Sequence, residues 1–318
     1  MGKFIEEKRF DKFIDFLKEK YEVIAPVHEK GSIRFKILEE GDEIVFSMPY
    51  YPAKKFFLPS CETLFNFNKD KIVKEGDKIK KRVIFLEKCD AAALVMLDKI
   101  MLRDPVDPYY KKRRDNTLII ESPCFPDYSE CFCDINKLPD NYDLRLVEHN
   151  GKYFFQVGSK KGKKLLEKAP IKNSKVDIKD IPSKCENAKC DFVLHEKEIK
   201  GKNEKIWKEE AAKCLSCGAC TVVCPTCNCF EIKDELDANC KEGKRTRRWS
   251  SCQLPNFTQV AGGHVFRLDR DNRVKQRVLH KFKYTKEQFG EISCVGCGRC
   301  VAACPTKINI FEIVKKLK

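Results

Sequence analysis

A cysteine pattern occurs twice in the C-terminal half of the chain. It reads Cys-x2-Cys-x2-Cys-x3-Cys-Pro, first from Cys214 to Cys224 and again from Cys294 to Cys304. Three cysteines at this spacing fold a tight loop around three corners of an iron–sulfur cubane, and the fourth, followed by Pro, ligates the other cluster. The repeat therefore predicts two [4Fe–4S] clusters whose ligands cross between its two halves.

The crossed rule assigns a ligand set to each cluster. Cluster 1 takes Cys214, Cys217, Cys220 and Cys304, and cluster 2 takes Cys294, Cys297, Cys300 and Cys224. Glycines lie inside the loops, where the backbone must fold closely around sulfur. The alternative is a pair of zinc ribbons, but zinc sites use two Cys pairs separated by a longer spacer. Three evenly spaced thiolates plus Cys-Pro, twice, are typical of bacterial ferredoxins instead.

Four more cysteines lie in the N-terminal half, and two of them follow predicted buried strands. Cys89 comes after the run RVIFL, and Cys124 comes after TLIIE. Ligands of open α/β sheets bind at the carboxyl ends of the strands, and the turn ECFC, with Cys131 and Cys133, can deliver two more thiolates to that edge. Spacing alone leaves two interpretations open: a third cluster on these four cysteines, or buried thiols without a metal.

The remaining cysteines of the chain's 19 are Cys61, Cys185, Cys190, Cys227, Cys229, Cys240 and Cys252. Cys227 and Cys229 follow Cys224-Pro225 in CPTCNCF and are expected close to a cluster. With Cys252 they make three thiols, one short of a ligand set unless Cys240 joins them. We interpret them as structural thiols or as groups directed at a ligating sulfur. The pair in the expected linker, Cys185 and Cys190, has no assigned role.

Hydrophobic periodicity indicates the elements that position these cysteines. Apolar residues at helical spacing predict a helix within 4–21, and β-like runs follow at 33–38 and 44–48. A strand at 82–86, a helix at 91–102 and a strand at 117–121 form a βαβ unit, hence a parallel strand pair.

Two connections complete this part of the chain. The stretch DPVDPYYKKRR is expected to be a loop. Asn150–Gly151, between YDLRLVEH and KYFFQV, predicts a β-hairpin.

The predicted fold class is an α/β N-terminal domain with a βαβ unit, followed by a C-terminal dicluster ferredoxin-like domain with a long insertion. The expected boundaries are 1–167 for the first domain, 168–203 for a linker and 204–318 for the second, with the insertion at 225–293.

The insertion is rich in arginine. Its span 245–277 holds seven arginines and Lys275 against only Asp269 and Asp271, and 271–284 is expected to be helical. We interpret this span as a docking face for an acidic electron-transfer partner; the alternative is a solvated helix face.

Composition narrows the class of protein. The 318 residues are 42% hydrophobic and 35% charged, which is typical of a globular chain with a charged surface. No apolar run is long enough for a membrane span, and the N-terminus resembles no signal peptide. We therefore expect a cytoplasmic protein whose cysteines hold metal, not disulfides. The net charge of +15 comes mostly from scattered lysines, and no nucleic-acid motif accompanies it.

At these residues the chain resembles a known family: the beta subunit of cytosolic sulfhydrogenase-type nickel–iron hydrogenases, and the related iron–sulfur subunit of anaerobic sulfite reductase. The matching strings run in family order from about residue 56 to 311: CDAAALVMLDKIML, DPYYKKRRDNTLII, ECFC, CLSCGACTVVCPTCNCF, RRWSSC, AGGHVFR and CVGCGRCVAACP. They do not separate the two branches, although the ending INIFEIVKKL looks more like the hydrogenase branch. The stretch after ECFC is shorter here than the family's usual one.

The resemblance implies an electron conduit between two partners. One is a flavin-containing subunit that exchanges electrons with a nicotinamide nucleotide, and the other is a catalytic subunit. Cys89, Cys124, Cys131 and Cys133 match cysteines of the family pattern, which favours a third [4Fe–4S] cluster. Cys227, Cys229 and Cys252 also match the pattern, whereas Cys185, Cys190 and Cys240 do not.

The leading hypothesis is thus an iron–sulfur electron-transfer subunit of a cytoplasmic multi-subunit oxidoreductase, which is not catalytic alone. No GxGxxG or P-loop fingerprint occurs, so we expect no flavin or nucleotide in this chain. Two alternatives remain: a self-contained iron–sulfur reductase, and a free-standing ferredoxin-like carrier. The carrier is disfavoured because such proteins are small and acidic.

Overall fold

Two units make up the chain in the computed structural model, which describes residues 2–69, 71–73, 79–124, 129–133, 138–176, 199 and 203–317. Unit 1 comprises Met1–Ala53 and Ile79–Lys189, and unit 2 comprises Lys54–Lys78 and Cys190–Lys318. Lys54–Lys78 therefore groups with the C-terminal half, which the boundaries expected from the sequence do not include. The reason is strand pairing, because this segment contributes two strands to the sheet of unit 2.

Unit 1 is built on an eight-stranded mixed sheet in the order β10-β1-β9-β8-β7-β6-β2-β3. The central neighbours β2, β6, β7 and β8 run parallel, and the outer pairs are antiparallel. The strands are β1 (Gly2–Glu6), β2 (Glu22–Glu29), β3 (Ser32–Ile37), β6 (Arg82–Leu86), β7 (Thr117–Glu121), β8 (Leu144–His149), β9 (Lys152–Val157) and β10 (Lys172–Ser174).

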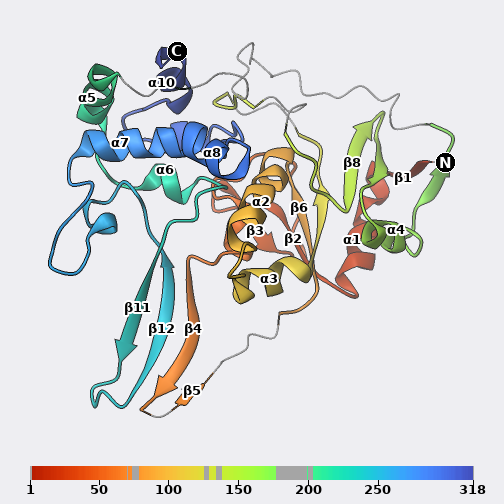
Figure 1. Ribbon diagram of the computed structural model, residues 1–318. Helices are drawn as coiled ribbons and strands as arrows, with labels where there is room; N and C mark the ends of the chain where they lie inside the picture. The colour runs from red at the N-terminus through yellow and green to blue at the C-terminus, as the bar shows by residue number, and fades with distance from the viewer. Residues whose placement is uncertain are drawn as a thin grey trace. The chain divides into compact units, whose positions relative to one another are not determined.

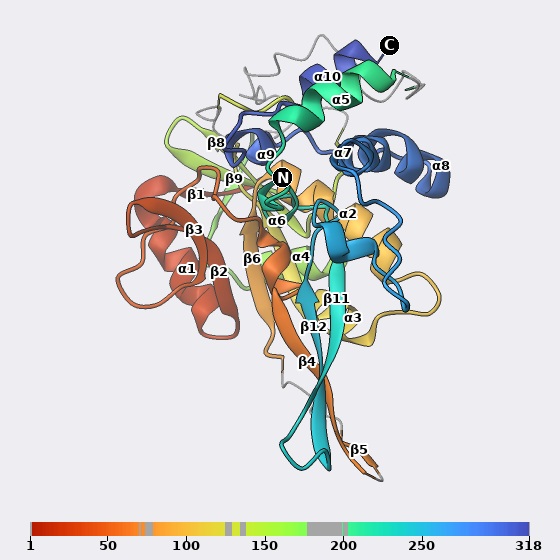
Figure 2. The same ribbon diagram turned by 90° about the vertical axis from the view of Figure 1, so that its left-hand side faces the viewer.

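Helices cover both faces of this sheet. Figure 2 shows α1 and α2 on either side of β6. The helix α1 inserts Phe10, Phe13, Ile14 and Leu17 into the main core, which β6 and β7 line with alternate residues. Every residue of β7 is buried, as expected for a strand covered on both faces. The helical segments are η1 (Glu7–Arg9), α1 (Phe10–Lys18), α2 (Lys88–Met101), α3 (Pro108–Asp115) and α4 (Lys160–Leu166).

The predicted βαβ unit is present, since β6 and β7 pair in parallel with α2 between them. The predicted hairpin is also present, between β8 and β9. Its two turn residues, Asn150 (φ 50°) and Gly151 (φ 68°), are both left-handed, as a type I′ turn requires.

The helix predicted within 4–21 is present as α1, and residues 2–6 before it form the strand β1, which pairs with β9. Other local predictions were wrong. The run 44–48 makes a single bridge, Ile44 to Val27, and the strand β2 was missed. The stretch expected to be a loop contains α3, because the Asp107 side chain caps its N-terminus and Pro108 occupies the first turn.

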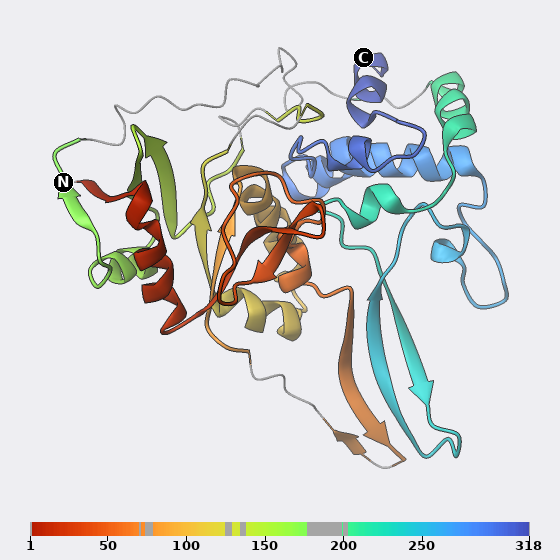
Figure 3. The same cartoon turned by 180° about the vertical axis from the view of Figure 1, so that it is seen from behind.

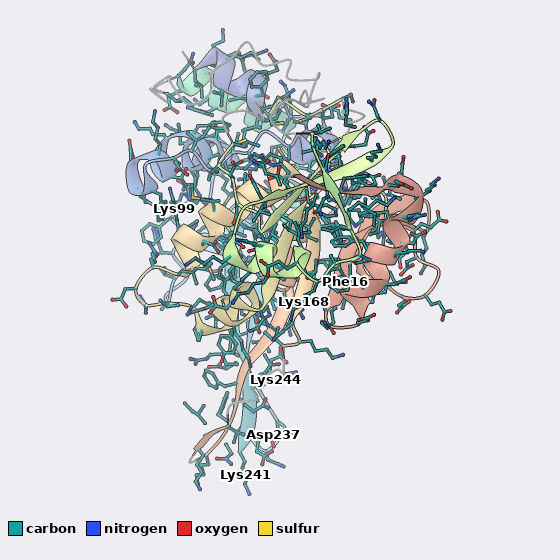
Figure 4. The ribbon with its side chains drawn as sticks, turned by 90° about the vertical axis from the view of Figure 1, so that its right-hand side faces the viewer. Phe16, Lys99, Lys168, Asp237, Lys241 and Lys244 are labelled. Carbon is teal, nitrogen blue, oxygen red and sulfur yellow. The ribbon has the colours of Figure 1, made fainter. Side chains whose placement is uncertain are left out.

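Unit 2 contains a four-stranded antiparallel sheet in the order β11-β12-β4-β5. It extends away from the helices of the same unit (Figure 1; Figure 3). Asp237, Lys241 and Lys244 lie at its far end (Figure 4). Gly243 is required there, since a Cβ atom would lie 2.7 Å from Phe67 Cζ. The strands are β4 (Cys61–Asn68), β5 (Lys71–Val73), β11 (Phe230–Leu236) and β12 (Glu242–Trp249).

The arginines of β12 pair with acids of neighbouring strands. Arg245 Nε donates to Asp234 Oδ1 at 2.7 Å, and Arg248 pairs with Glu235. Arg247 Nη2 lies 2.6 Å from Glu62 Oε1, and both side chains are about 95% buried. These three arginines therefore stabilise the sheet, which is a structural role that the docking-face interpretation did not anticipate.

Short helices complete unit 2. Helix α5 packs against α7, and Trp207 of α5 is fully buried. A π-helical turn, η6, continues α7 into α8 (Figure 1). The segments are η2 (Ala53–Phe56), α5 (Glu204–Lys213), α6 (Ala219–Val222), η5 (Pro255–Thr258), α7 (Arg270–Leu279), η6 (His280–Tyr284), α8 (Thr285–Phe289), α9 (Arg299–Ala302) and α10 (Ile310–Lys316). In the part of the chain that the structure describes, no helix has the length and apolarity to cross a membrane.

The buried Arg247–Glu62 pair gives a stability prediction. Glu62→Ala removes the carboxylate that pairs with the buried Arg247 charge, so we expect a loss of about 3–5 kcal/mol in the free energy of unfolding of unit 2. Asp234→Ala is the matched control, because it removes the partner of the exposed Arg245 and is expected to cost far less. Denaturant unfolding followed by tryptophan fluorescence reports on unit 2, since both tryptophans, Trp207 and Trp249, belong to it. Equal shifts of the unfolding midpoint in the two variants would contradict the role of the buried pair.

Candidate iron–sulfur sites

The first cysteine loop begins where α5 ends. Cys214 is the C-cap of α5, and its N–H donates to Ala211 O at 3.0 Å. The loop then turns through two left-handed residues, Ser216 (φ 54°) and Gly218 (φ 77°). The turn aims the Ser216 N–H at Cys214 Sγ, 3.4 Å away. Such an N–H donor stabilises the thiolate form of the cysteine, which is the form that binds metal.

The second loop repeats this backbone at the equivalent positions. Gly296 (φ 67°) and Gly298 (φ 71°) take the places of Ser216 and Gly218, and α9 follows as α6 does in the first loop. The repeat extends past the fourth cysteine of each half. Thr226 Oγ1 lies 3.4 Å from Cys224 Sγ, and Thr306 Oγ1 lies 3.4 Å from Cys304 Sγ. The repeated sequence therefore folds into a repeated structure.

The two halves of the repeat meet at one cavity. Cys214, Cys217 and Cys220 line it from the first loop, and Cys300 and Cys304 line it from the second. Its other lining side chains are mostly apolar, including Val274, Val278, Ile308, Ile310 and Ile313. The structure thus brings together the four cysteines that the crossed rule assigns to cluster 1, with Cys300 of the cluster 2 set beside them.

The other four cysteines of the repeat also interact with one another. Burial, together with the charge of Cys224, raises the pKa of Cys294, Cys297 and Cys300 to about 12 each. A hydrogen bond from the Cys227 thiol, together with nearby cations, holds the pKa of Cys224 well below its usual range. The set assigned to cluster 2 therefore combines one favoured thiolate with three thiols that need a cation or a metal to ionise.

The additional cysteines Cys227, Cys229 and Cys252 lie close to cysteines of the repeat: Cys227 beside Cys224, and Cys252 near Cys220. Cys229 and Cys252 share a hydrogen bond that raises the pKa of Cys229 and, with a donor from Gln253, lowers the pKa of Cys252 to about 6. Cys227 donates to Cys224, a predicted ligand. Cys61 and Cys240 are exposed. Cys185 and Cys190 lie outside the described residues.

One group of three side chains has its potential metal-binding atoms within 4.8 Å of one another. Across the described ranges, Glu87, Cys89 and Asp90 are the only His, Cys, Asp or Glu side chains that form such a group.

The N-terminal cysteines follow the carboxyl ends of β6 and β7. Cys89 lies in the first turn of α2 and is buried, as are Glu87 and Asp90 beside it. Cys131 Sγ and Cys133 Sγ are 3.3 Å apart. Cys124 is half-buried three residues after β7, and its neighbours 125–128 lie outside the described residues. The structure therefore places Cys89 at the predicted strand edge and Cys131 beside Cys133. Glu87 and Asp90 were not predicted, although EKCD directly after a buried strand carries the signal.

Ion pairs hold this edge of the sheet. Arg145 Nε lies 2.5 Å from Glu121 Oε1, and Asp140 contacts both Arg145 and Lys88. Burial raises the pKa of the Glu121 carboxyl, and the Arg145 partner opposes that shift. The last residue of β7 is thereby fixed next to the segment that carries Cys124.

Basic residues contact the cysteine loops of unit 2, and the sequence interpretation had placed two of them in a docking face. Arg277 Nε donates to Cys220 Sγ at 3.0 Å, and Arg273 Nη2 donates to Ser216 Oγ at 3.0 Å. Lys281 Nζ donates to Thr226 Oγ1 at 2.6 Å, and Lys54 Nζ donates to Cys227 O at 2.9 Å. Thiolates raise the pKa of Arg277 and of Lys281 against the opposing effect of burial. The donor set and these cations fit an anionic, cysteine-ligated cluster.

Comparison with known proteins also indicates an iron–sulfur protein. Residues 213–308 match the family described as a 4Fe-4S dicluster domain, and this span contains both cysteine repeats. The match implies two [4Fe–4S] clusters. Fold and site together define an iron–sulfur protein with a mixed α/β N-terminal region and a C-terminal dicluster domain.

A relative covers the full length of the chain. The Sulfhydrogenase 2 subunit beta of Pyrococcus furiosus is 32% identical over 330 residues, which span 99% of this chain and 97% of the relative. The chain therefore belongs to the sulfhydrogenase beta-subunit family, as the sequence resemblance predicted. It is an iron–sulfur electron-transfer subunit related to that protein. No solved structure matches the chain significantly.

Ligand crossing can be tested one cysteine at a time. Cys304→Ser should damage the cluster bound by Cys214, Cys217 and Cys220, since all four line one cavity. Cys224→Ser should damage the cluster bound by Cys294, Cys297 and Cys300. Electron paramagnetic resonance of the reduced variants distinguishes the two signals, and Cys240→Ser, an exposed cysteine, is the matched control. Damage to the sequence-local cluster in each variant would show that the ligands do not cross.

Proposed function

We propose that this chain relays electrons within a cytoplasmic multi-subunit oxidoreductase. Its partners are a catalytic subunit with hydrogenase activity and a flavin-containing NAD(P)-binding subunit. The observation that carries the proposal is the cavity in which Cys300 and Cys304 of the second repeat lie with the first three cysteines of the first repeat, because ligands shared between the repeats place two clusters side by side. Membership of a larger complex is supported by the relative, which is named as a subunit of a sulfhydrogenase.

The ligand sets of this proposal are the crossed ones. Cluster 1 is bound by Cys214, Cys217, Cys220 and Cys304, and cluster 2 by Cys294, Cys297, Cys300 and Cys224. Such clusters supply one-electron transfer without moving atoms. The chain's own residues bind the iron and exclude water, and they donate hydrogen bonds to sulfur from Ser216 N, Ile308 N and Arg277 Nε. Cys227, Cys229 and Cys252 act as structural thiols beside the two ligand sets.

A third [4Fe–4S] cluster is proposed in unit 1, on Cys89, Cys124, Cys131 and Cys133. Three features support it: the parallel pair β6–β7 ends at this edge, Cys89 and Cys133 are buried, and Cys131 lies beside Cys133. Ligands of open α/β sheets bind at such an edge.

The identity of the catalytic partner rests on the comparison with the relative alone. The name of the relative favours a hydrogenase over an anaerobic sulfite reductase, the other branch that the sequence resembles. No observation on the described residues favours a self-contained reductase.

Iron content tests the number of clusters. Protein assembled anaerobically should hold about 12 iron atoms, from three four-iron clusters, with no stoichiometric zinc. Cys131→Ser should reduce that number to about eight, whereas Cys61→Ser, which changes an exposed cysteine, should leave it unchanged. About eight iron atoms in the unaltered protein would remove the N-terminal cluster, and zinc in place of iron would overturn the whole proposal.

Electron entry tests the relay itself. Reduced nicotinamide nucleotide should bleach the cluster absorbance of the intact complex, and it should leave the isolated chain oxidised, because the nucleotide reacts at the flavin of another subunit. Dithionite should bleach both samples, which controls for intact clusters. Direct reduction of the isolated chain by the nucleotide would instead favour a self-contained reductase.

A further inference from the structure

One face of the continuous helix formed by α7 and η6 carries a row of buried cations. Arg273, Arg277 and Lys281 are spaced four residues apart, and they are 5%, 8% and 5% exposed. Residues four apart lie on the same face of a helix, where like charges destabilise it. The π-helical turn η6 begins just before Lys281, and such turns are frequent at functional sites. We call these three side chains the cation row.

The cation row faces the cysteine loops. Arg277 makes the most direct contact, with Nε 3.0 Å from Cys220 Sγ and Nη2 2.8 Å from Cys220 O. Lys281 Nζ reaches Thr226 Oγ1, which in turn lies 3.4 Å from Cys224 Sγ. Arg273 contacts the loop further out, at Ser216 Oγ. Arg277 is thus nearest to a ligand of cluster 1, and Lys281 is nearest to a ligand of cluster 2.

No carboxylate balances Arg277 or Lys281 within the described part of the chain. Their hydrogen-bond partners there are a sulfur atom, a carbonyl oxygen and a hydroxyl group. A charge buried without a counter-charge is strongly unfavourable, so these two side chains need an anion. A cubane with four thiolate ligands is an anion in both oxidation states, and it gains one more negative charge when it is reduced.

We propose that Arg277 and Lys281 set the reduction potentials of the two C-terminal clusters, Arg277 mainly that of cluster 1 and Lys281 mainly that of cluster 2. This inference rests on the proposed ligand sets. Both cations stabilise the reduced cluster more than the oxidised one, because the reduced cluster carries more negative charge. Net charge and hydrogen bonds to sulfur are among the factors that set cluster potentials. Both cations are positioning residues. Arg277 acts through Cys220, and Lys281 acts through Thr226, which lies beside Cys224.

The test is a redox titration monitored by electron paramagnetic resonance, on the full chain with its clusters. Arg277→Gln should lower the midpoint potential of cluster 1, so that its reduced-to-oxidised ratio at a fixed potential falls about tenfold, or about 59 mV for a one-electron couple. Cluster 2 should shift less. Lys281→Gln should lower the midpoint potential of cluster 2, and that of cluster 1 should shift less. Arg270→Gln is the matched control, since Arg270 is an exposed arginine of the same helix.

Conservative variants separate charge from structure. Arg277→Lys keeps the charge and should retain most of the potential, whereas a purely structural role would not distinguish Lys from Gln. If Arg277→Gln loses iron, Arg277→Lys and Lys281→Gln decide the matter, because Lys281 contacts no ligating sulfur directly.

Two results would overturn the inference: unchanged potentials in both Gln variants with all iron retained, or equal shifts in Arg277→Lys and Arg277→Gln. Either result differs from a failure of the proposed function, which would appear as missing clusters in the unaltered protein.

Discussion

A buried cation needs an anion, and the C-terminal unit is organised around that requirement. Arg277 and Lys281 are buried beside the cysteine loops without a carboxylate in the described residues, and Lys54 is buried against the same cysteine-rich segment. Thiolates alone would repel one another in this low-dielectric region, and the cations alone would also repel. Each set is stable only in the presence of the other. The same pairing explains how the ligands of an anionic cluster can lie beside buried cations.

The long insertion between the two cysteine repeats supplies the buried cations and the side chains that contact the cysteine loops. Its helix α7 and the turn η6 bring the cations, and its segment after β12 brings Cys252 and Gln253 against the first loop. Its hairpin, β11 and β12, pairs with β4 from the N-terminal half of the sequence, which is why unit 2 is assembled from two distant segments. Lys54, just before β4, then reaches the cysteine-rich segment at Thr221 O and Cys227 O.

Sequence alone predicted the features that have a local signal. The cysteine spacing, the buried runs of β6 and β7 and the Asn150–Gly151 turn each depend on neighbouring residues, and each was placed correctly. The pairing of β4 with β12 depends on residues almost 200 positions apart, so no local pattern reveals it. Helix α3 was missed because its polar sequence carries no apolar period, although Asp107 caps it. The docking-face interpretation did not distinguish the buried arginines Arg247, Arg273 and Arg277 from the others of the insertion, because composition does not reveal which way a side chain points. The four-residue spacing of Arg273, Arg277 and Lys281 was the signal that would have shown them on one helix face.

The central claim is that two iron–sulfur clusters in unit 2 take crossed ligands from both repeats. Anomalous scattering from anaerobic crystals, measured on both sides of the iron absorption edge, locates the metal directly. The account predicts two iron positions in unit 2, one bound by Cys304 with Cys214, Cys217 and Cys220, and the other by Cys224 with Cys294, Cys297 and Cys300. Metal that binds four cysteines of a single repeat, or an anomalous signal at the zinc edge in place of the iron edge, would contradict it.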